Sequence, residues 1–125
     1  MGTFSVATIV FRVGRPEHSR KLALVADTGA TYTTLPGSIL KELGVKAVRT
    51  HRLRLADGSV VEREMGEVAL DLGEGHSVSS TPVVFGSEEV FLLGSVTLEQ
   101  LSLAVDPENK RLVPGEGLLL SVQGL

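Results

Sequence analysis

Short apolar segments separated by turn-forming residues run along the whole chain. The apolar runs are interrupted about every eight to twelve residues by Gly, Pro, Asp or Asn, which is the spacing of strands in a β-sandwich or barrel rather than of helices. We therefore expect an all-β domain. The expected strands cover residues 4–11, 21–27, 51–64, 66–72, 80–86, 89–94, 101–106 and 117–122.

Alternation of apolar and polar residues supports the strand assignment in the middle of the chain. Leucines alternate with arginines in residues 52–55, and apolar residues recur at every second position of residues 66–72. A period of two is typical of a strand that is buried on one face. Asp57-Gly58 lies between two such runs and predicts a two-residue hairpin turn.

Two stretches show helical spacing instead. Residues 37–44 follow a proline, end on a glycine and carry apolar residues one turn apart, and residues 95–101 carry Leu98 and Leu101 at a similar spacing. Each stretch is long enough for about two helical turns. We expect one or two short helices beside the strands.

The length and composition of the chain limit its organisation and its partners. No linker or low-complexity block divides residues 1–125, so we expect a single domain, which at this size can bury a real core. The net charge of −3, with Lys and Arg scattered, argues against nucleic acid as a partner. The apolar runs are far shorter than the roughly 20 residues of a membrane-spanning helix, so no membrane partner is expected.

Cysteine is absent from the sequence. Disulfides and thiolate metal sites are thereby excluded, which fits a reducing compartment. The first residues also lack the basic region and the cleavage site of a signal peptide. We expect a cytoplasmic protein that needs neither a metal nor a cofactor.

One acidic residue leaves an apolar run abruptly. In "ALVADTGATYTTLP", residues 23–36, Asp27 ends a predicted strand and is followed by Thr28 and Gly29. Taken alone, an Asp-Thr-Gly triplet is typical of a turn or a helix cap. The segment "EVFLLGSVTLEQL", residues 89–101, shares the plan of strand, glycine, hydroxyl-bearing turn and short helix. We interpret the two as a weak repeat about a pseudo-twofold axis, with the carboxylate in the first copy only.

Three motifs in this order resemble those of a known family. The motifs are Asp27-Thr28-Gly29-Ala30-Thr31 after an apolar strand, the Asp57-Gly58 hairpin, and Leu92-Leu93-Gly94 before a short helix. Together they resemble the retropepsin-like aspartic proteases, and the cellular and prokaryotic members more than the viral ones. The resemblance covers residues 4–114 and implies an all-β, retropepsin-like (acid protease) β-barrel with one or two short helices, working as a homodimer.

The resemblance implies that Asp27 is the catalytic residue of an aspartic endopeptidase. Hydrolysing a peptide bond without a metal or a nucleophilic side chain takes one carboxylate that accepts a proton from water and a second, protonated one that polarises the carbonyl. The chain has one such loop, so the second Asp27 would come from another copy. By the same resemblance, Gly29 lets backbone N–H groups approach the carboxylate, Thr28 bonds the partner's loop, and Ala30 stands where some relatives have Ser.

The Asp57-Gly58 hairpin resembles the flap that covers the substrate in this family. We expect the substrate-binding tip of the flap at Ala56, Asp57, Gly58 and Ser59. A peptide substrate would lie extended beneath it, with strand-like main-chain hydrogen bonds. The tip lacks the glycine-rich sequence of viral relatives, and Ser95 stands where viral members carry an arginine that braces the dimer.

The remaining polar candidates have simpler interpretations, and two functions stay open. His18, His51 and His76 show no metal-ligand spacing and are expected to be solvated, and Asp106, which precedes a proline, is expected in a turn. The chain is either an active aspartic endopeptidase or a catalytically weak or inactive retropepsin-fold module for peptide binding and dimerisation. The intact Asp27 motif favours the enzyme, because a pure binder has no use for a costly buried carboxylate pair.

Overall fold

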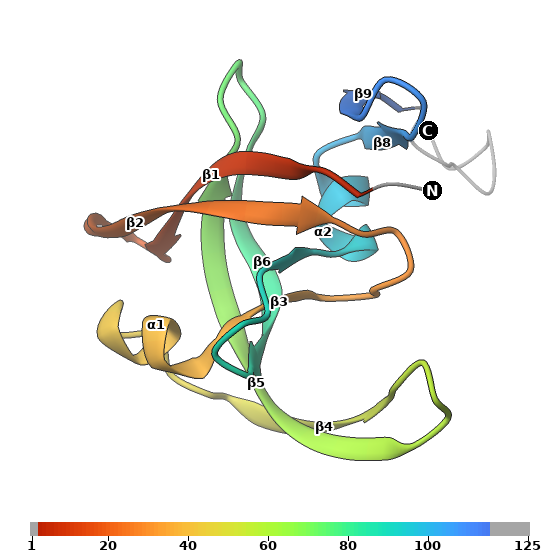
Figure 1. Ribbon diagram of the computed structural model, residues 1–125. Coiled ribbons are helices and arrows are strands. Elements are labelled where there is room, and N and C mark those ends of the chain that lie inside the picture. Colours follow the sequence, from red (N-terminus) through yellow and green to blue (C-terminus); the bar gives the residue numbers. More distant parts are fainter. Residues whose placement is uncertain (1–2, 116–125) are drawn as a thin grey trace, which may run out of the picture.

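The computed structural model describes residues 3–115. Within them the chain forms strands of different lengths and two short helices (Figure 1). The strands are β1 (Ser5–Arg12), β2 (Arg15–Ala26), β3 (Thr33–Pro36), β4 (Arg49–Arg54), β5 (Val60–Asp71), β6 (Ser77–Gly86), β7 (Leu92–Leu93), β8 (Leu103–Asp106) and β9 (Arg111–Pro114). The helices are α1 (Gly37–Glu42) and α2 (Ser95–Gln100).

The predicted all-β class and both short helices are confirmed, with differences at individual elements. β3 and β9 were not predicted, and β2 begins at Arg15, earlier than expected, because its polar first half pairs with β1 in an exposed hairpin. β5 runs without interruption through residue 65, where the sequence predicted a break. The strand predicted at residues 117–122 lies outside the described residues.

Seven of the strands form one sheet that closes on itself. Their order is β1-β2-β7-β3-β6-β5-β4, and β1 also pairs with β5 through the register Val10↔Leu70. This second pairing joins the two sides of the sheet into a barrel. β4 and the first half of β5 extend beyond the closed part as a hairpin, which crosses the bottom of the view in Figure 1. β8 and β9 form a separate two-stranded sheet.

Two parallel pairings interlock the halves of the chain. β2 pairs with β7 (Val25↔Leu92), and β3 pairs with β6 (Thr34↔Val84). The chain follows one plan twice, with a long strand, a turn, a short strand and a short helix: β2, β3 and α1, then β6, β7 and α2. The predicted repeat is therefore present in the fold, but its alignment was wrong, because the counterpart of the strand before the acidic motif is β6 and not β7.

The two turns of this repeat are closed by equivalent hydrogen bonds. The N–H of Ala30 donates to the carbonyl of Asp27 at 3.1 Å, and the N–H of Val90 donates to the carbonyl of Ser87 at 3.2 Å. Asp27 directly follows β2 and Ser87 directly follows β6. Ser87 therefore holds the position in the second copy that the carboxylate holds in the first.

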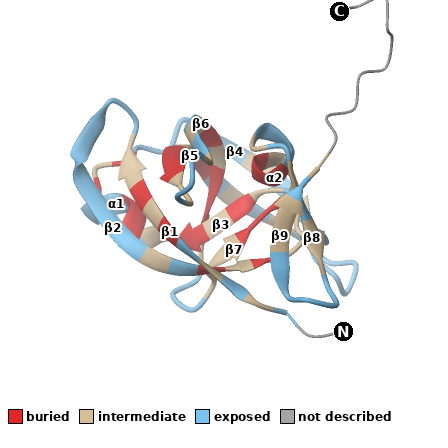
Figure 2. Ribbon diagram, turned by 90° about the horizontal axis from the view of Figure 1, so that it is seen from above, coloured by how far each residue is buried: buried red, intermediate tan, exposed pale blue. Residues whose placement is uncertain are grey.

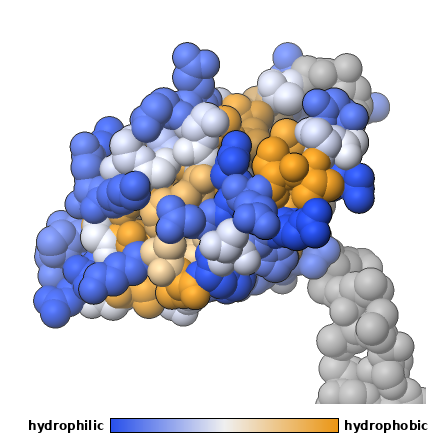
Figure 3. Space-filling view, turned by 90° about the horizontal axis from the view of Figure 1, so that it is seen from below, coloured by the Kyte–Doolittle hydropathy of each residue, from blue (hydrophilic) through white to orange (hydrophobic). Residues whose placement is uncertain are grey.

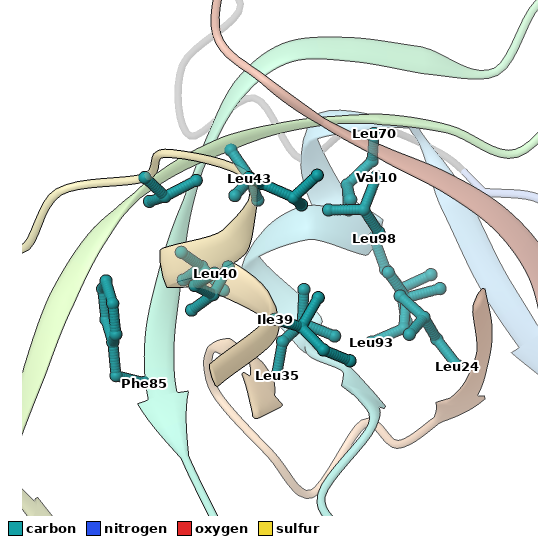
Figure 4. Packing of buried hydrophobic residues seen from close by; sticks show 13 residues of the cluster. Val10, Leu24, Leu35, Ile39, Leu40, Leu43, Leu70, Phe85, Leu93 and Leu98 are labelled. Atoms are coloured by element: carbon teal, nitrogen blue, oxygen red, sulfur yellow. The ribbon is translucent and has the colours of Figure 1, made fainter. Parts of the chain in front are cut away.

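The hydrophobic core lies inside the closed sheet, where buried residues from several strands meet (Figure 2). Leu24, Leu70 and Leu93 are fully buried there, and Ile39 and Leu40 of α1 belong to the same cluster, with Ile39 on the side toward Leu35 and Leu93 (Figure 4). Seen from below, the surface is mostly hydrophilic, with smaller apolar patches between the polar side chains (Figure 3). Among residues 3–115, no helix has the length and apolar character needed to cross a membrane.

Candidate active site

The loop after β2 holds Asp27 by main-chain hydrogen bonds. The N–H of Asp27 donates to the carbonyl of Leu93 in β7 at 3.1 Å, which fixes the residue at the end of the sheet. The N–H of Gly29 donates to Asp27 Oδ1 at 2.9 Å. This bond is the backbone contact expected from the sequence, and it orients the carboxylate toward the inside of the loop.

Gly29 leaves room for that carboxylate. A Cβ at position 29 would lie 3.1 Å from Asp27 Oδ1, a tighter contact than carbon and oxygen ordinarily make in proteins. Asp27 itself is partly buried, whereas Thr28 is exposed on the outer side of the loop. Within a single chain, Thr28 therefore has its side chain available for a second molecule rather than for the core.

The segment after β7 supports the acidic loop from behind. The N–H groups of Ser95 and Val96, at the start of α2, donate to the carbonyls of Ala30 and Thr31 at 2.8 and 3.0 Å. These two segments of the chain approach so closely that a Cβ on Gly94 would lie 2.4 Å from the carbonyl carbon of Tyr32. Gly94 is therefore required for the close packing of these two segments.

Three buried threonines connect the elements beneath the loop. Thr97 Oγ1 lies 2.6 Å from Thr33 Oγ1 and 2.7 Å from Thr81 Oγ1, so α2, β3 and β6 share one chain of hydroxyl hydrogen bonds. The N–H of Gly94 donates to Thr33 Oγ1 at 3.1 Å and extends the chain to β7. Sequence reasoning missed this network because the threonines of "TYTTLP" were taken for a turn, and their partners are distant in the sequence.

A groove of about 760 Å³ opens beside Asp27. The acidic loop forms one side of it, and the β4–β5 hairpin forms the other; in Figure 1 the tip of this hairpin lies on the same side of the molecule as the loop after β2. Asp27 is the one carboxylate among the described residues that line it. The hairpin contributes residues 51–56, Val61 and Arg63, the acidic loop contributes Asp27, Gly29 and Ala30, and β6 and β7 with their connection contribute Val84, Val90 and Leu92.

The predicted flap residues occupy the tip of this hairpin. Ala56 lines the groove, whereas Asp57, Gly58 and Ser59 lie at the exposed end beyond it. The loop has three residues rather than the predicted two, because Leu55 and Ser59 form the last pair through the bond from Leu55 N–H to the Ser59 carbonyl at 2.8 Å. Gly58 has φ 88°, and its position after a tight turn matches the common three-residue hairpin with a left-handed glycine.

Asp57 stabilises the tip through its side chain. Its Oδ1 accepts hydrogen bonds from Ser59 Oγ at 2.6 Å and from Ser59 N at 2.9 Å. The Ser59 hydroxyl, and next the Ser59 N–H, hold the pKa of Asp57 below its ordinary value. The tip is therefore ordered by a local acceptor, and no contact with the rest of the chain is needed to form it.

Two other sequence candidates have clear positions. His51 differs from the expectation of a merely solvated side chain: it lines the groove, and its ring meets that of Tyr32 edge to face with centroids 5.8 Å apart. Asp106 was predicted in a turn but is the last residue of β8, directly before the β8–β9 turn, where it accepts from Asn109 Nδ2 at 2.9 Å. Among residues 3–115, no group of three or more His, Asp or Glu side chains is placed to hold a metal ion.

Comparison with solved structures shows the same fold in two proteases. The EIAV protease, in a complex with the inhibitor HBY-793, matches with a TM-score of 0.55 and 18% identity, covering 80% of this chain and 88% of that one. A retropepsin-like aspartic protease from Rickettsia conorii matches with a TM-score of 0.51 and 23% identity, covering 85% and 86%. At these identities the two matches show a retropepsin-like fold and do not by themselves show an activity.

Sequence comparison gives two further findings. The chain is 31% identical over 103 residues to alanine racemase of Yersinia pestis, a match that covers 75% of this chain and spans 28% of the length of that protein. We attach no racemase function to so small a part of that enzyme. A family model described as aspartyl protease matches residues 17–119, which include the Asp27 loop, the hairpin and α2. The chain therefore belongs to the aspartyl protease family.

Proposed function

We propose that the protein is a homodimeric aspartic endopeptidase whose active site contains one Asp27 from each chain. The observation that carries this proposal is the Asp27 loop itself. It holds a partly buried carboxylate against the N–H of Gly29 at 2.9 Å and opens on a groove of about 760 Å³. A pair of carboxylates, one ionised and one protonated, supplies both the base and the acid for amide hydrolysis at the same time.

Among residues 3–115, no second carboxylate lies in the groove to complete this pair. The described residues that line the groove include no other Asp or Glu, and Ser87 occupies the equivalent position in the second copy of the internal repeat. The exposed side of the loop, with Thr28, is free within one chain to meet the same loop of another. A twofold axis beside this loop would bring two copies of Asp27 together.

The chemistry then follows from one proton shared between two carboxylates. The ionised Asp27 takes a proton from a water molecule while the protonated Asp27 donates its proton to the carbonyl oxygen of the substrate. The water oxygen bonds to the carbonyl carbon and forms a neutral tetrahedral diol. Transfer of a proton to the amide nitrogen then accompanies cleavage of the C–N bond, which releases an amine and a carboxylic acid and restores the shared proton.

The hairpin supplies the substrate-binding roof in this proposal. It faces Asp27 across the groove, and its inner residues Leu53 and Val61 offer an apolar surface to side chains of the substrate. An extended peptide would bind as an additional strand, with main-chain hydrogen bonds for affinity and side-chain pockets for specificity. Two hairpins from the two chains would cover it from both sides.

The test is digestion of an unbiased peptide library, read by mass spectrometry. We expect cleavage within peptides that is blocked by a transition-state mimic in which a hydroxyl group replaces the tetrahedral diol. Binding of the mimic without any cleavage would support a non-catalytic peptide-binding module instead. Cleavage that resists the mimic but stops with a metal chelator would contradict the proposed chemistry.

A further inference from the structure

The inner face of the β4–β5 hairpin carries two cross-strand pairs of different character. His51 lies opposite Arg63, and Leu53 lies opposite Val61. All four residues line the groove, as expected when alternate residues of a hairpin share one face. The apolar pair lies nearer the tip, and the basic pair lies farther along the hairpin toward the barrel.

The arginines on the two faces of the hairpin have different cross-strand neighbours. On the outer face, Arg52 lies opposite Glu62, so a carboxylate neighbours the guanidinium. On the inner face, Arg63 lies opposite His51, and no ion pair within residues 3–115 includes it. One hydrogen bond of its guanidinium is made to the carbonyl of Glu62 at 3.1 Å. Arg63 is half-buried and has five donors, so most of them remain for a ligand.

Charge along the groove is also one-sided. Arg63 and His51 of the inner face line it, and Arg52 and Arg54 of the outer face also reach it, although Arg52 neighbours Glu62; among the described residues, Asp27 is its single carboxylate. A guanidinium binds a carboxylate through two parallel hydrogen bonds and is a strong recognition element for such a group. A groove with this lining attracts acidic side chains and repels basic ones.

We propose that Arg63, with His51 beside it, forms a subsite that selects a Glu or Asp side chain of the peptide substrate. The proposal rests on the proposed function and names the substrate class of that site. Arg63 is four residues beyond the closing pair of the hairpin tip, which is about 13 Å of strand at the usual rise. The subsite therefore lies along the hairpin, away from its tip and toward the barrel.

Symmetry gives this subsite a second copy. In the proposed homodimer, each chain contributes one hairpin, and the twofold axis passes between the two Asp27 residues. The Arg63 of each chain then lies toward one end of the groove. We therefore expect acidic residues to be selected on both sides of the cleaved bond, at matching distances from it.

The experiment measures binding and cleavage separately. An immobilised Asp27→Asn variant is exposed to a random decapeptide library, and the enriched peptides are sequenced. The same selection is repeated with Arg63→Gln added, and with Arg49→Gln as the matched control. Arg49 is an exposed arginine of the same strand as His51 and does not line the groove.

We expect the Asp27→Asn variant and the Arg49→Gln control to enrich Glu and Asp over Gln about five- to tenfold, the range for a partly solvated charged hydrogen bond. Arg63→Gln should lose this preference, and Arg63→Glu should replace it by a preference for Lys or Arg. Thermal melting of each variant checks that the fold is kept. Enrichment without Glu or Asp, or an acidic preference that survives in Arg63→Gln and Arg63→Glu, would overturn the subsite.

Whether the protein with Asp27 intact cleaves the peptides tests the proposed endopeptidase function. Acid-selective binding that depends on Arg63, together with no cleavage of the selected peptides, would support the subsite and contradict the endopeptidase. Cleavage of library peptides with no acidic preference at any position would support the endopeptidase and contradict the subsite. The two proposals therefore fail in different measurements.

Discussion

In the proposed endopeptidase, Asp27 is the residue on which the chemistry depends. Replacing it by Asn keeps the shape of the side chain and an oxygen that accepts from the Gly29 N–H, but the amide neither ionises nor shares a proton. We expect Asp27→Asn to fold normally and to lose several orders of magnitude in kcat/KM. Asp71→Asn is the matched control, because Asp71 lies outside the groove and its oxygen accepts from the Gly73 N–H in a similar local contact. Equal rates in the two variants would exclude Asp27 as the catalytic residue.

Asp57 is an acidic residue of a different kind, with a structural contact and no place in the groove. The Ser59 hydroxyl donates to it and lowers its pKa, so Ser59→Ala should raise that pKa toward the ordinary value, while Ser59→Thr should not. Since the folded pKa is the lower one, this contact stabilises the tip above the ordinary carboxyl pKa and is lost as the pH falls through the lowered value. Carboxyl-carbon NMR titration of the three proteins measures the shift. A pKa of Asp57 that does not change in Ser59→Ala would contradict the assigned cause.

At the scale of elements, we propose that motion of the hairpin matters for substrate capture. Gly58 has φ 88° with open space around it, and Gly14 in the β1–β2 turn has φ 75° and is equally open. A valine at either position meets the same backbone strain, about 1–2 kcal/mol. We expect Gly58→Val and Gly14→Val to lose similar thermal stability, but only Gly58→Val to reduce kcat/KM. Equal kinetics in both variants would show that the hairpin tip plays no part in capture.

How far the sequence predicted these elements depended on where their partners lie. β1, β4 and β6 were found from alternation and turn residues in their own segments, and α1 was found from the flanking proline and glycine. β3 was missed because Thr33–Pro36 has the composition of a turn and becomes a strand only between β6 and β7, which lie far along the chain. The Asp27 loop was recognised because its motif is local.

The basic pair in the groove could not be predicted, and the reason is register. A two-residue turn at Asp57-Gly58 would place His51 opposite Glu64, whereas the three-residue turn places it opposite Arg63. A shift of one residue in one strand changes every cross-strand pair and the side of the sheet that each side chain faces. The same dipeptide occurs in both turns, so its presence in the sequence did not decide between them.

At the scale of the whole molecule, the proposed active site is shared between two chains. Mixing therefore gives a direct test: subunits with Asp27→Asn exchange into dimers that hold one carboxylate and one amide. A tenfold excess of this variant should lower the rate of the wild-type protein roughly tenfold, because few dimers then keep two carboxylates. An equal excess of Asp71→Asn should increase the rate. Activity that is unaffected by the Asp27→Asn subunits would contradict a shared site.

The pH dependence also belongs to the dimer rather than to one residue. Two carboxylates that share a single proton are active in one of three protonation states, so kcat/KM should follow a bell. The acid limb reports loss of the negative charge, and the alkaline limb reports loss of the shared proton. Sedimentation at each pH separates these limbs from dissociation of the dimer. A rate that rises steadily into the alkaline range would point to a different catalyst.

The threonine network forms only late in synthesis, because it joins segments that are far apart in the sequence. Thr33 and Thr97 are hydrogen-bonded although 64 residues separate them, and the N–H of Asp27 needs the carbonyl of Leu93. While the ribosome is still adding the residues of α2, the acidic loop has been made but lacks the strand and helix that hold it. A nascent chain therefore carries the complete Asp-Thr-Gly motif without an assembled site until α2 has been made, and in the proposed enzyme cleavage of neighbouring polypeptides has to wait until then.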